Sequence, residues 1–210
     1  REIAIDGSVN KQVVQLEFVA NAPPGARSYE SAVTLDTSAT YFNAALVLIG
    51  LDPAHARNRP RQHFDPAVPE GDHVEIWIEC PQGPCQRVPI EQVVYDRQKQ
   101  EALSGGQWIY TGSQFLPDGR YQPELDGTLI GFVRDPAEII TYSGPGGLNR
   151  FGQFIINPGL GLGDGTAVDD GARVGGSVLW DGVHVGARGG GRAGEQLQEI
   201  ERRALGREQG

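Results

Sequence analysis

One stretch, residues 29–51 with the sequence YESAVTLDTSATYFNAALVLIGL, limits the fold more than any other part of the chain. Residues 31–35 alternate between two sets of side chains, which is typical of a pleated strand. Asp36, Thr37 and Ser38 follow directly. Side chains of these types accept hydrogen bonds from the free N–H groups in the first turn of a helix. The stretch therefore predicts a strand, a capped turn and a helix in immediate succession.

The helix is predicted to span about residues 37–50 and to end at Gly50, because glycine tolerates the left-handed conformation that closes helices. Apolar side chains recur along it at spacings of three and four, which places them on one face. They are Tyr41, Phe42, Ala45, Leu46 and Ile49. A helix this short depends on packing for its stability, so we expect it to lie on a sheet.

The rest of residues 12–157 alternates between short extended segments and turns. Residues 73–80 and 108–115 are examples of strand-like segments, and turn signals such as Pro117-Asp118-Gly119 separate them. We count six or seven short strands with hairpin-like spacing. The prediction is an α+β domain over 12–157, mostly antiparallel, with one main helix packed on the sheet. Residues 1–11 are predicted to form an extended lead-in.

The composition changes at residue 158. Residues 158–194 contain thirteen of the thirty glycines, which predicts a long glycine-rich arm. Residues 195–207 are predicted to form a short C-terminal helix with a narrow apolar stripe. The apolar residues expected to bind a partner protein are Leu160, Leu162, Val178, Leu179, Trp180, Leu197 and Ile200. The alternative is that the arm wraps its own domain and completes the sheet with residues 177–185.

Charge and hydropathy exclude two classes of function. Eighteen basic and 27 acidic residues give a formal net charge of −9, which argues against a nucleic-acid partner. The longest apolar run, residues 44–51, is much shorter than the roughly 18–20 residues that a transmembrane helix needs. The sequence has no methionine and begins at Arg1, so either a leader has been removed or the chain has been cut, and we expect a removed leader.

Cys80 and Cys85 flank a four-residue turn between two predicted strands. Opposed positions in a hairpin bring Cβ atoms within reach of a disulfide, so we predict a Cys80–Cys85 bridge and an oxidising compartment. Free thiols and half of a metal site are the alternatives. Zinc would need two further ligands, and no neighbouring residues have the required spacing.

The chain shows no arrangement of residues that indicates catalysis. His55 and His63 share the 52–69 loop with Asp52 and Asp65, which leaves a metal site there as an alternative to solvated side chains. The glycines at 159–165 lack the strand, helix and lysine of a phosphate-binding loop. We expect no enzymatic activity and no cofactor.

Five sequence segments carry a family resemblance. They are ESAVTLD at 30–36, AALVLIG at 44–50, GDHVEIWIE at 71–79, GQWIYTGSQF at 106–115 and GTLIGFVRDP at 127–136. In this order they resemble the YdjY-domain family of bacterial proteins over roughly residues 10–157. The family is largely uncharacterised, so the resemblance implies no catalytic residues. Its association with redox proteins does not extend to an iron–sulfur cluster here, because a cluster needs about four cysteine ligands and the chain has two.

These observations lead to a functional hypothesis. The chain is predicted to be a non-enzymatic structural or accessory subunit, periplasmic or extracellular, at the periphery of a larger membrane-bound complex. Electron-transfer and photosynthetic complexes are candidate assemblies. Docking is expected through the glycine-rich arm and the C-terminal helix. The alternative is a free periplasmic module that binds a small ligand or a metal through the 52–69 loop.

Overall fold

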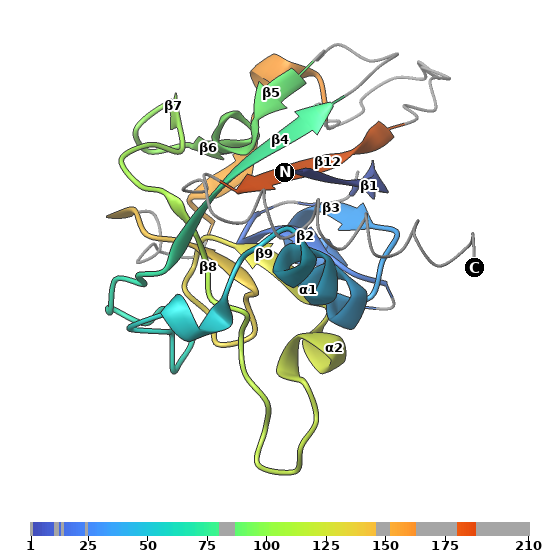
Figure 1. Ribbon diagram of the computed structural model, residues 1–210. Helices are drawn as coiled ribbons and strands as arrows, with labels where there is room; N and C mark the ends of the chain where they lie inside the picture. The colour runs from blue at the N-terminus through green and yellow to red at the C-terminus, as the bar shows by residue number, and fades with distance from the viewer. Residues whose placement is uncertain are drawn as a thin grey trace, which may run out of the picture.

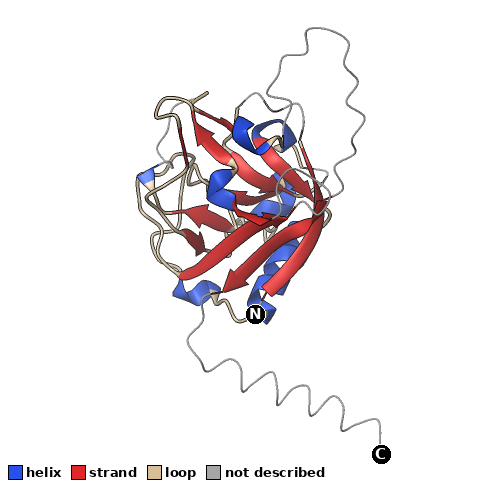
Figure 2. Cartoon of the chain, turned by 90° about the horizontal axis from the view of Figure 1, so that it is seen from above, coloured by secondary structure: helices blue, strands red, loops and turns tan. Residues whose placement is uncertain are grey.

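The computed structural model describes residues 2–10, 13, 15–23, 25–79, 87–145, 152–162 and 180–187, the last segment by its backbone. The helices are α1 (Ala39–Leu48) and α2 (Gln122–Asp126), and short 3₁₀ helices lie at Ser28–Glu30, Pro53–His55, Ile90–Gln92 and Pro158–Leu160. The strands are β1 (Glu2–Val9), β2 (Phe18–Asn21), β3 (Ser31–Leu35), β4 (Asp72–Glu79), β5 (Arg87–Pro89), β6 (Val94–Asp96), β7 (Glu101–Ala102), β8 (Trp108–Tyr110), β9 (Thr128–Gly131), β10 (Ile140–Tyr142), β11 (Phe154–Ile156) and β12 (Trp180–Ala187). The regular secondary structure of the described residues is mainly strand, and the helices are short (Figure 2).

The main sheet is curled and closes on itself. Its nine strands follow the order β12-β1-β3-β2-β9-β10-β8-β4-β5, and β12 also pairs with β4 (Figure 1). The pairs β2–β3 and β9–β10 are parallel, and the other pairs in this sheet are antiparallel. A second, three-stranded sheet has the order β11-β6-β7.

The predicted α+β fold, one main helix packed on six or seven strands, is wrong. The described chain is mostly β, with a larger, closed sheet and α1 and α2 as its only α-helices. The difference arises at the two ends of the chain. Residues 2–9, expected as a lead-in, form β1, and residues 180–187 form β12 between β1 and β4. This placement agrees with the alternative in which the arm completes the domain's own sheet.

The core lies inside the curled sheet and under α1. Its largest fully buried side chains are aromatic: Trp108, Tyr110, Tyr142, Phe18, Phe42 and Phe132. Helix α1, Ala39–Leu48, is shorter at both ends than the predicted span of about 37–50, and it begins after Ser38, whose hydroxyl accepts a hydrogen bond from the Tyr41 N–H at 3.2 Å. It contacts β9 and lies beside α2 (Figure 1).

Candidate functional site

Helix α1 is apolar on both its inner and its outer side. Its ten residues, ATYFNAALVL, include no charged side chain. Phe42 and Leu46 are fully buried, whereas Tyr41 and Leu48 keep 75% and 74% of their surface exposed. A helix that is apolar all round is normally buried in a core or covered by a partner. The outer side of α1 is therefore the strongest candidate for a protein-binding surface.

The neighbouring helix extends this exposed surface. Leu125 of α2 is 45% exposed, and the Glu124 carboxylate accepts two hydrogen bonds of 2.8 Å from the Thr40 N–H and hydroxyl, which join α2 to the first turn of α1. We define the α1–α2 surface by its exposed apolar residues. They are Tyr41, Ala44, Val47 and Leu48 of α1 and Leu125 of α2.

The outward residues of α1 have the spacing of a helix–helix seam. Tyr41, Ala44 and Leu48 are three and four residues apart, with the small Ala44 at the centre. The sequence-based expectation placed Tyr41 with the core residues, and the structure shows it outside. The sequence nevertheless contained evidence of an apolar outer surface. Apolar residues occur at 41, 44, 47 and 48, outside the face that contains the buried Phe42 and Leu46.

Every charged side chain on α1, α2 and the turns that flank α1 is acidic. Asp36 and Asp52 lie at the two ends of α1, and Glu124 and Asp126 lie on α2. The α1–α2 surface is thus an apolar strip with a negative border. This combination suits a partner that presents apolar and basic side chains together.

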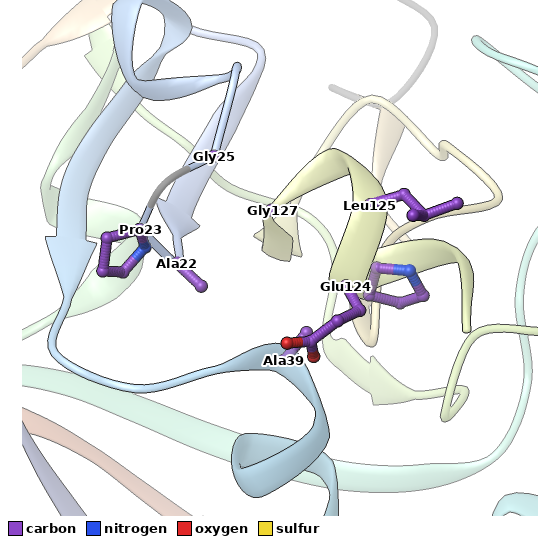
Figure 3. A pocket seen from close by; sticks show the side chains of 8 residues that line it. Ala22, Pro23, Gly25, Ala39, Glu124, Leu125 and Gly127 are labelled. Atoms are coloured by element: carbon purple, nitrogen blue, oxygen red, sulfur yellow. The ribbon is translucent and has the colours of Figure 1, made fainter. Parts of the chain in front are cut away.

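A small pocket opens at the end of this surface, between α2, the first residue of α1 and the turn after β2 (Figure 3). Its volume is about 50 Å³. It is lined by Ala22, Pro23, Gly25, Ala39, Pro123, Glu124, Leu125 and Gly127. Gly25 and Gly127 lie back to back: a Cβ on Gly127 would collide with the Gly25 backbone, and a Cβ on Gly25 would collide with the Ala22 carbonyl oxygen. The two glycines therefore bring the turn and α2 close enough to form the pocket floor.

A network of charged groups lies on another part of the molecule. His63 Nδ1 is 2.7 Å from Asp135 Oδ2, and His63 Nε2 is 3.2 Å from Glu17 Oε2. The hydrogen bond with Asp135, supported by the one with Glu17, raises the pKa of His63 to about 9. His63 is therefore a cation held between two carboxylates near neutral pH, which suits a structural ion pair better than a general base.

Residues next to this network have strained backbones. Phe64 and Arg134, which follow His63 and precede Asp135 in sequence, have positive φ angles of 56° and 58°. The buried Arg134 guanidinium donates hydrogen bonds to the carbonyl oxygens of residues 66, 67, 143 and 144. It thereby joins the 52–69 loop to the residues that follow β10. These hydrogen bonds give the positive φ angle of Arg134 a structural reason.

Glu138 is fully buried in the link between β9 and β10, and its carboxylate oxygens make no well-aligned hydrogen bond within the described residues. The nearby Thr141 hydroxyl offsets only part of the effect of burial on the pKa. Burial raises the pKa of Glu138 to about 8, so the side chain is largely neutral at pH 7. Gly131 faces it, and a Cβ at Gly131 would overlap the carboxyl group. Sequence reasoning did not single out Glu138, because its burial depends on the strands around it.

The structure does not combine His55 and His63 into one site. His55 is exposed and lies 2.9 Å from Asp72, whereas His63 is held by Asp135 and Glu17. In the described part of the chain, no group of three or more histidine, cysteine, aspartate or glutamate side chains is arranged to hold a metal ion. The metal alternative therefore gains no support from these residues.

A shallow groove follows the outer side of β4. Two adjoining pockets of about 210 and 290 Å³ share Glu75 and Glu91, with Trp77 at one end and Trp108 at the other. Glu91 accepts a hydrogen bond of 2.8 Å from Trp108 Nε1. Neither His63 nor Glu138 lines this groove or the pocket of Figure 3, so the residues with shifted pKa values do not meet a ligand-sized space there.

The residues predicted to bind a partner fall into three groups. Leu162 is buried in the domain's own core and Leu160 packs against it, so their position gives no support to partner contact. Trp180 begins β12, which is described by its backbone. The predictions for Val178, Leu179, Leu197 and Ile200, the C-terminal helix and the Cys80–Cys85 disulfide lie outside the described residues.

Among the described helices, none has both the length and the apolar character needed to cross a membrane.

No curated protein matches the chain in sequence, and no solved structure matches it. The family model described as the YdjY domain matches residues 1–143, from β1 through β10, including α1 and α2. The match covers more than half of the 210 residues, and the chain therefore belongs to the YdjY domain family.

Proposed function

We propose that this chain is a non-enzymatic accessory subunit that docks onto a larger protein assembly through the α1–α2 surface. The observation that carries the proposal is the outward face of α1, where Tyr41 and Leu48 are about three-quarters exposed on a helix without charges. Exposed apolar side chains that form a continuous strip mark interaction sites.

The partner is expected to supply a helix with an apolar stripe flanked by lysine or arginine. The spacing of Tyr41, Ala44 and Leu48 fits a helix–helix contact, and the acidic border made by Asp52 and Glu124 favours basic neighbours. The same border, together with the net charge of −9, disfavours binding to an anionic membrane.

The proposal moves the docking site from the glycine-rich arm to the body of the domain. The backbone of β12 is already paired with β1 and β4, so residues 180–187 have no free strand edge for a partner.

We keep an extracytoplasmic location as part of the proposal. Its support is the spacing of Cys80 and Cys85, which favours a disulfide and an oxidising compartment.

The test compares the native size of full-length variants extracted gently from their own host. We expect the parent chain to migrate with an assembly well above its own 22.6 kDa. Leu48→Glu should release it to the monomer size, because a charge would be buried in the apolar contact. Val68→Glu is the matched control, since Val68 is exposed and apolar but lies in the 52–69 loop.

Two results would contradict the proposal. One is a parent chain that migrates alone at its own mass. The other is a Leu48→Glu variant that stays in the assembly as firmly as Val68→Glu. Thermal unfolding of both variants checks that neither charge acts by unfolding the domain.

A further inference from the structure

The pocket at the end of the α1–α2 surface has the dimensions of a single side-chain end. Pockets that hold small molecules usually measure about 300–1,000 Å³, and one water in the liquid takes about 30 Å³. At about 50 Å³, this pocket is too small for a free metabolite. It lies directly beside Leu125, so a partner seated on the α1–α2 surface would cover it.

The lining combines apolar residues with one charged group. Ala22, Pro23 and Pro123 are among the apolar lining residues. The Glu124 carboxylate lies over Ala39, and the Leu125 side chain points away from it (Figure 3). An alkyl stem can pack against the apolar residues while its end reaches the carboxylate. This is how long charged side chains cover apolar surface while keeping their charge paired.

The hydrogen bonds of Glu124 favour a compact cation. Both bonds from Thr40 go to Oε2, and Oε1 makes no hydrogen bond within the described residues. A guanidinium pairs best with two carboxylate oxygens, whereas an ammonium is a point charge that needs one. One available oxygen and a small volume therefore fit lysine better than arginine.

We infer that the pocket is the receptor for one lysine side chain of the docked partner, with its stem against Pro23 and Pro123 and its ammonium on Glu124 Oε1. This inference rests on the proposed function and sharpens it by naming the anchoring group. It also fixes how the partner helix is aligned along α1, because the lysine must follow the apolar stripe that packs on the α1–α2 surface.

The test uses N-acetyl-lysine methylamide and the full-length chain, followed by the amide shifts of Gly25, Leu125 and Gly127 in two-dimensional NMR. N-acetyl-norleucine methylamide is the matched probe, since it keeps the four-carbon stem and lacks the ammonium. We expect saturable shifts with the lysine probe in the millimolar range, weakened by salt, and much smaller shifts with norleucine.

Two variants test the role of the carboxylate. Glu124→Gln keeps the shape and an acceptor for Thr40, and it should remove most of the lysine-dependent shift. Glu70→Gln removes an exposed carboxylate outside the pocket and should leave binding unchanged. Equal binding of both probes, retained lysine binding in Glu124→Gln, or no lysine-dependent shift at these amides would each overturn the inference.

The outcome is separable from that of the docking experiment. If Leu48→Glu releases the chain from its assembly and the lysine probe does not bind, docking stands and the lysine assignment fails. If the lysine probe binds as expected and Leu48→Glu stays assembled, the pocket binds lysine but the α1–α2 surface is not the docking site.

Discussion

The outer side of α1 exposes apolar side chains, whereas the link between β9 and β10 buries an ionisable one. On α1, leucine and tyrosine point into solvent, while in the link a glutamate is fully buried. A buried carboxyl group is tolerated in its neutral form, and burial favours that form by raising the pKa of Glu138 to about 8. Nothing within the described domain covers the exposed apolar side chains of α1. The buried glutamate is therefore explained by the fold itself, whereas the exposed face of α1 is explained by the proposed partner.

The comparison is tested most strongly within α1 itself, where Leu46 and Leu48 are two residues apart. Leu46→Ala should destabilise the domain by about 2–5 kcal/mol, because it leaves a cavity in a fully buried site. Leu48→Ala should change stability by less than about 0.5 kcal/mol, because the side chain is 74% exposed. Urea denaturation measures both values. A large loss for Leu48→Ala would mean that this residue belongs to the core.

The second prediction concerns Glu138→Gln, which keeps the shape of the buried side chain and removes its ionisation. The ordinary glutamate pKa of 4.5 applies to the unfolded chain, and the folded value is about 8. Between these values the unfolded chain releases a proton that the folded chain retains, so the stability of the parent falls as pH rises from 4.5 to 8.

Glu138→Gln should therefore be more stable than the parent at pH 8, by an amount on the order of 4 kcal/mol, and nearly equal to it near pH 4. Urea denaturation at several pH values gives the difference. If parent and variant show the same change of stability between pH 5 and pH 8, Glu138 does not titrate in that range and its environment is more polar than the buried site implies.

Local features of the fold were predictable from the sequence, and long-range ones were not. The main helix and strand β3 followed from alternation, the Ser38 cap and Gly50, which are all encoded within a few residues. Closure of the sheet depends on pairs such as Glu2 with Gly186, which are far apart in the chain. The glycines in β12 also weaken the strand signal, because glycine has no side chain to pack on a pleated surface.

The candidate site was predictable in part. The apolar character of α1 was visible, but its apolar residues continue from the buried face to the outer one, so the spacing did not decide on which side Tyr41 lies. The pocket was not predictable, because Gly25 and Gly127 meet through the fold and not through a motif. The His63 network was also missed as a unit, since Glu17, His63 and Asp135 come from three distant segments.

The third prediction has the smallest expected effect and concerns that network. The folded pKa of His63 is about 9 and the ordinary value is 6.5, so the stability that its charge contributes is complete below pH 6.5 and is lost as pH rises through 9. His63→Gln should cost about 1 kcal/mol at pH 6, a modest value because the ring is partly exposed and solvent screens the pair. The cost should vanish near pH 10.

The two carboxylates that hold His63 provide an internal comparison. Asp135 is the closer and less exposed partner, at 2.7 Å against 3.2 Å for Glu17. Asp135→Asn should therefore lower the pKa of His63 more than Glu17→Gln does, as measured by NMR titration of the imidazole protons. Equal effects would mean that the general negative field acts on His63, and not the specific hydrogen bond with Asp135. A His63 pKa near 6.5 in the parent would show that neither carboxylate holds the ring in solution. The comparison with the α1 face would then lose its example of a charged group that the fold itself pairs.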